Sequence, residues 1–340
     1  MSLQIVWFVL WGILWAAYFV LDGFDLGAGM LYGFLGRNAA EKAAIRRSIG
    51  PVWDGNEVWL LTAGGATFAA FPAAYASLFS FLYSALLLIL FGLIFRGAAL
   101  EFRAKSAGAA WARTWDLVFG AASFLPALLF GVAFGNLFRG LPIDASGYHG
   151  TLLGLLNPYG ILTGVLFAAM FGVHGALWVS LKTAGELGAR AQRMAGELWS
   201  YLLILAAGFL AASYFSTQLA VNYLKSPFWA AIPAGAVAAL FATRFFISRK
   251  RAFAAFLSSG ATILLVTATG LVGLFPNLIP SRMDPAFSLT IFNSSSSPYT
   301  LKIMTVVALV FVPIVIAYQI WVYRVFRHKI DAAGGDGENY

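Results

Sequence analysis

Four acidic side chains stand out because they lie in stretches that are otherwise apolar. Asp22 and Asp25 occupy an apolar run from residue 3 to 35, and Asp54 and Glu57 open the next such run. A charged side chain at the centre of a bilayer costs about 2.5–3.5 kcal/mol on insertion scales, so such residues usually face protein or water and serve a function. Carboxylates held close together in a medium of low dielectric constant resist simultaneous ionisation. This set is therefore a candidate relay that binds and releases protons.

The spacing along the first run places Asp22 and Asp25 on one face of a helix, because aromatic, acidic and glycine residues alternate at the helical period. With a rise of about 1.5 Å per residue, Asp22 lies roughly 28 Å from Leu3, near one edge of an apolar layer about 30 Å thick. Asp54 and Glu57 enter from the same edge, so the four carboxylates are expected to converge. The stripe on the first helix consists of Trp11, Trp15, Tyr18, Asp22, Asp25 and Gly29.

Each carboxylate also has a purely structural interpretation. Asp54 follows Pro51 at the start of a helix, where a negative charge offsets the positive end of the helix dipole. Asp22 and Asp25 would then hydrogen-bond to a neighbouring helix. Glu57 is the weakest of the four candidates, since a solvated position at the membrane rim explains it equally well.

The histidines and the missing cysteines limit what else this chain binds. The sequence has no cysteine, which excludes disulfides, iron–sulfur clusters and thiolate metal sites. His174 lies inside an apolar run and is interpreted first as a hydrogen-bonded packing residue, whereas His149 and His328 lie in polar segments. One buried imidazole cannot serve several haems, so we expect this chain to ligate no haem iron and to hold no metal.

The composition identifies the elements that must position these residues. Of 340 residues, 61% are hydrophobic and 11% charged, and the mean hydropathy is +0.81. An ordinary soluble domain carries roughly 25% charged residues, so this is an all-α, polytopic membrane protein. The sequence predicts about nine transmembrane helices, at residues 3–35, 52–72, 76–96, 115–138, 158–181, 198–220, 228–247, 253–275 and 301–324.

The distribution of lysine and arginine predicts the orientation. Of the 22 cations, eighteen lie in the odd-numbered connections and after the ninth run, and four lie in the others. Arg96 is counted among the eighteen, in the connection after the third run. Cytoplasmic loops carry the excess of Lys and Arg, so the N-terminus is expected outside and the C-terminus inside. The net charge of +8 is thereby explained without a nucleic-acid partner.

The chain is predicted to form one transmembrane domain over residues 1–330, followed by a flexible acidic tail over 331–340. Leu21-Asp22-Gly23 late in the first run is similar to Val173-His174-Gly175 late in the fifth. This suggests two bundles of four helices plus one peripheral helix, although the match is too short to demonstrate a repeat.

The motifs around the carboxylates resemble those of a known membrane family. They are followed by similar motifs as far as the ninth run. The stretches are Asp22-Gly-Phe-Asp25-Leu-Gly-Ala-Gly29, Gly50-Pro-Val-Trp-Asp54-Gly-Asn56-Glu-Val-Trp59, Phe130-Gly131-Val-Ala-Phe-Gly135-Asn136 and Leu156-Asn157-Pro158-Tyr159-Gly160. On these the sequence resembles subunit II of cytochrome bd quinol oxidase.

This resemblance implies a subunit of an electrogenic quinol:oxygen oxidoreductase in the bacterial inner membrane. The partner, subunit I, would carry haem b and haem d, or haem b in place of haem d, and would oxidise the quinol. The present chain would be a scaffold without a complete active site, and Asp22, Asp25 and Asp54 match the family's acidic positions on a cytoplasmic proton path. Some members hold a structural quinone, and a small single-helix third subunit joins some complexes. The alternative from the residues alone is a proton-coupled transporter or channel subunit that uses the same carboxylates.

Overall fold

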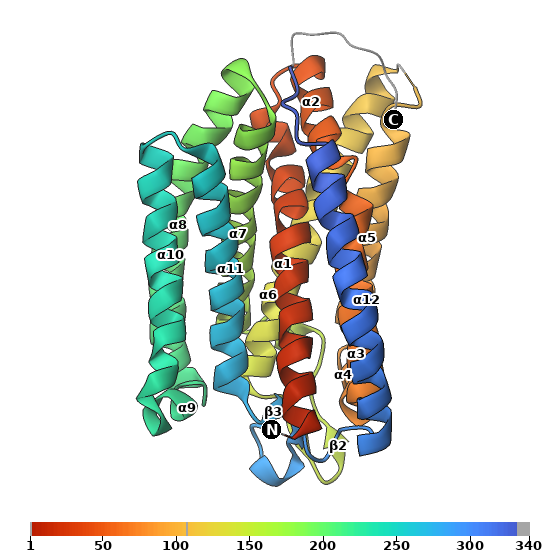
Figure 1. The fold of residues 1–340 in the computed structure, drawn as a ribbon, viewed down its shortest axis with the longest axis vertical. Helices are drawn as coiled ribbons and strands as arrows, with labels where there is room; N and C mark the ends of the chain where they lie inside the picture. Colours follow the sequence, from red (N-terminus) through yellow and green to blue (C-terminus); the bar gives the residue numbers. More distant parts are fainter. Residues whose placement is uncertain (1, 107, 332–340) are drawn as a thin grey trace.

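The computed structural model describes residues 2–106 and 108–331, and within them the chain is almost entirely helical (Figure 1). Of the predicted tail, only Asp331 falls within these residues. The sheet in the described part consists of two short hairpins, β1 Ile143–Asp144 with β2 Gly147–Tyr148, and β3 Asn277–Ile279 with β4 Leu289–Thr290. The helices are α1 Leu3–Leu35, α2 Ala39–Ile49, α3 Trp53–Ala70, α4 Pro72–Phe81, α5 Tyr83–Phe102, α6 Ala109–Arg139, α7 Pro158–Lys182, α8 Gly185–Ser216, α9 Ala220–Lys225, α10 Ala231–Ser248, α11 Ala252–Leu274 and α12 Pro298–Val325.

Eight helices of the described chain are long and apolar enough to cross a membrane. They match eight of the nine predicted runs. The run predicted at 52–72 corresponds to α3, which is not among the eight because polar residues open it. At about 1.5 Å per residue, its 18 residues extend about 27 Å. The count of nine therefore stays a prediction that depends on α3.

The boundary between the second and third predicted runs is different in the structure. The chain leaves the helix at Phe71, because Pro72 has no N–H for the helical ladder and disfavours a helical residue before it. The short helix α4 follows, and α5 then continues to Phe102, beyond the predicted end at residue 96. Arg96 therefore lies inside a helix and not in a connection.

The eight long apolar helices of the described chain, together with α3, form two groups of four and one peripheral helix, which is the arrangement that the sequence predicted. In the first group α1 packs on α3 and α6, and α5 packs on α6. In the second group α7 packs on α8 and α11, and α10 on α11 and α8. Contacts of α7 with α1 and α6 join the groups, while α12 packs chiefly on α1 and α3 at the periphery (Figure 1).

Glycine allows the two groups to approach closely at α1 and α7. A methyl group added at Gly27 would clash with the backbone of Phe171 and Gly175. Small residues at helix interfaces are the usual means by which membrane helices pack, because hydrophobicity does not drive their association within lipid. The contact fixes α1 against α7 within one turn of Asp22 and Asp25.

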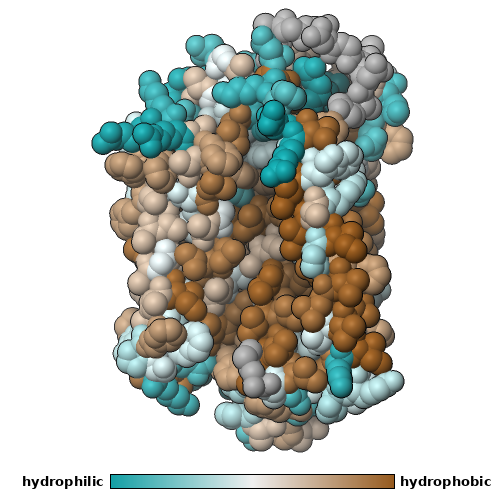
Figure 2. Space-filling model, in the orientation of Figure 1, coloured by the Kyte–Doolittle hydropathy of each residue, from teal (hydrophilic) through white to brown (hydrophobic). Residues whose placement is uncertain are grey.

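Polar residues gather at the end of the bundle where α2 lies, and hydrophobic residues cover its middle (Figure 2). The helix α2 begins with Asn38, whose side chain accepts the backbone N–H of Glu41 at 2.9 Å. Arg190 donates to Glu41 at 2.6 Å and holds the pKa of that carboxyl below its usual value. These contacts tie α2 to α8 at the basic end.

We predict that this basic end faces the cytoplasm. Cysteine introduced by Ala40→Cys, in the first turn of α2, should react with a membrane-impermeant maleimide only after the membrane is opened, whereas Ala145→Cys, in the β1–β2 hairpin, should react in intact cells. Both positions are exposed and lie at opposite ends of the bundle (Figure 1).

The unmodified chain contains no cysteine and is the matched control for background labelling. Three predicted crossings separate residues 40 and 145. Labelling of both variants from the same side would contradict this odd number of crossings and the predicted orientation.

Candidate functional site

The predicted carboxylates Asp22 and Asp25 lie at the interior of the helix bundle. Both side chains are 0% exposed, although α1 carries them in a segment that is apolar on either side. Buried charges are tolerated in proteins when they are paired or hydrogen-bonded. The partners of these two residues therefore define the site.

Arg96 of α5 forms ion pairs with two of the four predicted carboxylates. Its Nη1 donates to Oδ1 of Asp22 at 2.7 Å, and its Nη2 donates to Oε2 of Glu57 at 2.9 Å. The arginine is 1% exposed, while the Glu57 side chain is 23% exposed. The sequence analysis assigned Arg96 to a cytoplasmic connection, whereas in the structure it is the centre of the site. Glu57, the weakest candidate from the sequence, is one of its two ion-pair partners.

Asp25 is bound by an amide and not by the arginine. Asn56 of α3 donates from Nδ2 to Oδ2 of Asp25 at 2.8 Å, and the Asn56 side chain is fully buried. Oδ1 of Asn56 in turn accepts from Gln319 at 2.9 Å and from the Tyr323 hydroxyl at 2.8 Å, both on α12. The peripheral helix therefore contributes to the site, which the sequence analysis did not predict.

Several buried polar atoms of the cluster have no hydrogen-bond partner among the described residues. They are Oδ2 of Asp22, Oδ1 of Asp25, Nε of Arg96 and the Tyr18 hydroxyl. An unsatisfied buried polar group costs about 1–3 kcal/mol, and native proteins commonly satisfy such groups with internal water. The carboxylate oxygens that remain are the atoms at which this cluster would exchange protons.

Asp54 is not part of the buried cluster. It is exposed in the first turn of α3, one turn before Glu57. Three of the four predicted carboxylates therefore converge around Arg96, while Asp54 lies at the surface beside them. Burial increases along the series from exposed Asp54 through Glu57 to fully buried Asp22 and Asp25.

The buried histidine is fully engaged by the protein. Nδ1 of His174 lies 3.1 Å from the Ser259 hydroxyl, and Nε2 lies 3.1 Å from the carbonyl oxygen of Val20. Its ring stacks on Phe256 at 4.4 Å between centroids. His149 and His328 are exposed. These surroundings agree with the packing role that the sequence favoured for His174. Across the described ranges, no three His, Cys, Asp or Glu side chains gather as a metal site.

A second polar cluster lies at the basic end and joins four helices. Asp116 of α6 accepts from Lys42 at 2.8 Å, from Arg103 at 2.7 Å and from the Tyr32 hydroxyl at 2.9 Å. These donors come from α2, from the residue after α5 and from α1. The cluster is a structural tie, since its single carboxylate is compensated by two cations.

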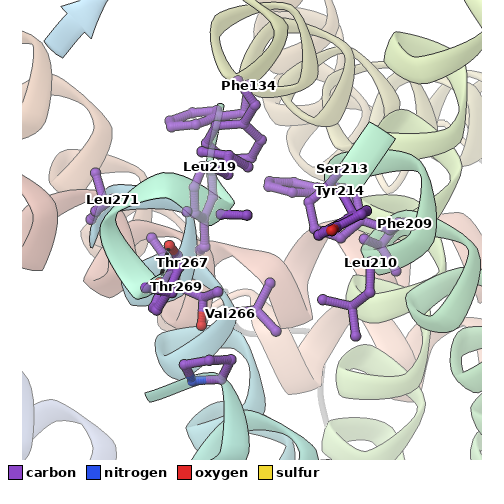
Figure 3. A pocket seen from close by; sticks show the side chains of 18 of the residues that line it. Phe134, Phe209, Leu210, Ser213, Tyr214, Leu219, Val266, Thr267, Thr269 and Leu271 are labelled. Carbon is purple, nitrogen blue, oxygen red and sulfur yellow. Dashed lines mark hydrogen bonds between the residues drawn. The ribbon is translucent and has the colours of Figure 1, made fainter. Parts of the chain in front are cut away.

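An apolar pocket of about 250 Å³ lies between α6, α8, α9 and α11. Figure 3 shows side chains of α8 and α11 facing each other across it. Its hydroxyls are largely engaged, since Ser213 pairs with Tyr159 at 2.7 Å and Tyr223 donates to the Thr269 carbonyl at 2.6 Å. Two of its lining residues, Leu210 and Tyr214, are also exposed on the surface of the bundle.

We predict that Arg96→Met destabilises the chain more than any single apolar truncation near it, by about 3–5 kcal/mol, because Asp22 is left buried without its counter-charge. The double variant Arg96→Met with Asp22→Asn should recover much of the loss. The measurement is the thermal midpoint and the folded yield in detergent, with Arg113→Met at an exposed position as the control. A parental midpoint for the single variant would show that the ion pair is not a stabilising constraint.

Comparison with known proteins assigns the chain to a family. Residues 3–326 match the model of the family described as Cytochrome bd terminal oxidase subunit II. The chain is 37% identical to a cytochrome bd ubiquinol oxidase subunit 2 of Bacillus subtilis (strain 168), with 97% of each chain covered. It is 36% identical to a cytochrome bd-I ubiquinol oxidase subunit 2 of Escherichia coli (strain K12), covering 94% of this chain and 93% of the relative. Its fold is similar to a chain of the solved bd oxidase from Geobacillus thermodenitrificans, with a TM-score of 0.77, 16% identity, and coverage of 96% and 99%. The chain therefore belongs to the cytochrome bd terminal oxidase subunit II family.

Proposed function

We propose that this chain is the second subunit of a quinol:oxygen oxidoreductase, in which it supports the haem-bearing subunit I and supplies protons from the cytoplasm. Family membership supports the oxidase over the transporter alternative. The observation that supports the proton role is the graded burial of the carboxylates, from exposed Asp54 to the three that converge around Arg96.

The proposed path follows the burial of its members. Asp54 at the surface would collect protons from the cytoplasm, and Glu57, half-buried beside Arg96, would pass them inward. Asp22 and Asp25 would hold them at Oδ2 and Oδ1, the oxygens without a protein donor. Carboxyl groups suit this task because they change protonation, which neutral amides do not.

Reduction of oxygen to water consumes protons, and their origin determines whether the reaction is electrogenic. Protons taken up through this chain from the cytoplasm, combined with protons released outside when quinol is oxidised, would generate a transmembrane potential. The role of Arg96 would be to keep the carboxylates at fixed positions without itself exchanging protons, because a guanidinium stays protonated in proteins.

The histidines of this chain do not fit a haem iron. Both ring nitrogens of the buried His174 are engaged by Ser259 and Val20. We therefore assign haem b and haem d, or haem b in place of haem d, to subunit I. A small single-helix third subunit would bind elsewhere on the complex.

The apolar pocket between α8 and α11 would accommodate a structural quinone or a lipid chain. Its apolar walls, its engaged hydroxyls and its opening toward the lipid-facing surface favour a hydrocarbon tail over a polar ligand (Figure 3).

The proton role predicts that Asp25→Asn and Asp54→Asn slow oxygen consumption and proton uptake by at least about tenfold, a lower bound below the roughly 10²–10⁴-fold that a positioned general acid–base group contributes. Asn keeps the shape and much of the hydrogen bonding of Asp but does not titrate. Turnover and proton uptake are measured with the purified complex in vesicles, and haem content is determined from its absorption spectrum.

The matched control is Asp284→Asn, at an exposed outer-loop position whose capping contact to Ala286 an Asn side chain retains. If the assembled Asp25→Asn and Asp54→Asn complexes turn over at the parental rate across pH, these residues are structural and the path is wrong.

The haem assignment predicts that His174→Ala keeps the full haem complement of the complex. The loss of contacts to Ser259 and Val20 should lower stability only. Reduced-minus-oxidised spectra of the purified complex measure this, and His174→Gln, which keeps hydrogen-bonding groups, is the companion variant if the alanine variant assembles poorly. Selective loss of one haem band in an assembled variant would assign an iron ligand to this chain.

A further inference from the structure

A chain of hydrogen bonds runs from α3 through α12 to Asp25. Nε1 of Trp59 donates to Oε1 of Gln319 at 2.7 Å, and Nε2 of Gln319 donates to Oδ1 of Asn56 at 2.9 Å. Tyr323 donates to the same Asn56 oxygen at 2.8 Å, and Nδ2 of Asn56 donates to Oδ2 of Asp25 at 2.8 Å. Every bond in the series donates toward the carboxylate.

The direction of this chain is fixed at its origin. An indole N–H only donates, so Gln319 must present its oxygen to Trp59 and its NH₂ group to Asn56. Asn56 must then present its oxygen to Gln319 and Tyr323 and its NH₂ group to Asp25. A flipped Asn56 amide would point its NH₂ group at the NH₂ group of Gln319, donor against donor, and only the Tyr323 hydroxyl could accept from it. Oδ2 of Asp25 is therefore held as an acceptor, and a proton on Asp25 has only Oδ1 available.

We propose that Gln319 and Tyr323 of α12 are positioning residues for Asp25. By orienting Asn56 they keep Oδ2 occupied and direct proton exchange to Oδ1, which has no partner among the described residues. This inference rests on the proposed proton path and adds to it a helix that carries no carboxylate of the cluster.

The helix α12 is held at both ends so that this contact has a fixed register. Near its start, Trp7 of α1 donates to the Leu301 carbonyl and to the Thr305 hydroxyl, each at 3.1 Å. Beyond its end, Lys182 of α7 donates to the carbonyl oxygens of Phe326 and His328. Gln319 and Tyr323 are four residues apart and share one helix face. Both therefore reach Asn56 together.

The charged and titratable groups around Asp25 come from four helices. They are Asp22 and Tyr18 on α1, Glu57 on α3, Arg96 on α5 and Tyr323 on α12. Gln319→Leu and Tyr323→Phe leave all the charged groups in place. An effect of these variants on proton exchange would therefore act through the orientation of Asn56.

The test compares Gln319→Leu, Tyr323→Phe and the double variant in the purified complex, with Tyr318→Phe as the matched control. Tyr318 lies on α12 directly before Gln319 and is 62% exposed. The readouts are haem content, the pH profile of turnover, and the infrared carboxyl and carboxylate bands of Asp25, identified by their absence in Asp25→Asn.

We expect Tyr323→Phe to slow turnover by less than about fivefold, because Gln319 still orients Asn56, and Gln319→Leu to have the larger effect, because the Tyr323 hydroxyl accepts as well as donates. In the double variant the amide is free to flip, and the pH profile should move about one unit toward higher pH, the equivalent of one hydrogen bond to a charged group. The Asp25 infrared band should move with it, while haem content and the control stay at the parental values.

A parental pH profile and a parental Asp25 band in the assembled double variant would overturn the positioning role. If the double variant does not assemble, the Asp25 band of Gln319→Leu decides, because the Tyr323 hydroxyl that remains can accept as well as donate and does not fix the Asn56 amide. An unmoved band in that variant overturns the proposal. Parental turnover of Asp25→Asn would instead refute the proton path, while the infrared band still reports whether α12 positions Asp25.

Discussion

The burial of one guanidinium is the constraint on which the first helical group depends. Taking a charge out of water costs several kcal/mol, and an arginine cannot avoid this cost by losing its proton. Arg96 on α5 therefore requires both Asp22 on α1 and Glu57 on α3. Apolar surfaces within lipid do not by themselves drive helices together. The ion pairs of Arg96 therefore fix the positions of α1, α3 and α5 along their axes relative to one another.

The hydropathy of the sequence predicted the helices that cross the apolar layer but not their ends. It marked residues 198–220, whereas α8 begins at Gly185, because the helix continues into a polar segment beyond the membrane. It placed a break close to the end of α3, where a proline follows Phe71, but it did not separate α4 from α5, which both fall in the run predicted at 76–96. The arrangement in two groups of four helices with α12 outside them agrees with the expectation, although the short internal similarity did not demonstrate it.

The acidic residues of the site were predicted from the sequence. Its neutral residues, and the contacts between segments distant in the sequence, were not. Helical spacing correctly placed Asp22 and Asp25 together. Counting cations on each side of the membrane assigned Arg96 to a connection. Apolar residues flank it in the sequence on both sides, and this pattern could have indicated that Arg96 lies inside a helix. The contact between Gln319 and Asn56 joins residues 263 positions apart, and no local pattern indicates such a pairing.

The balance of charge within the cluster connects its structure to its proposed function. Among the described residues, Arg96 is the one cation paired with this cluster, against the three carboxylates of Asp22, Asp25 and Glu57, and Asn56 binds Asp25 with a neutral donor. In a medium of low dielectric constant, negative charge without a counter-charge is neutralised by bound protons, provided that a proton source lies within reach. The exposed Asp54 lies one turn from Glu57 and is the outermost carboxylate of the series. With one cation against three carboxylates the cluster is two positive charges short, and in the proposed path bound protons would supply the difference and would be replaced each time one leaves toward the partner subunit.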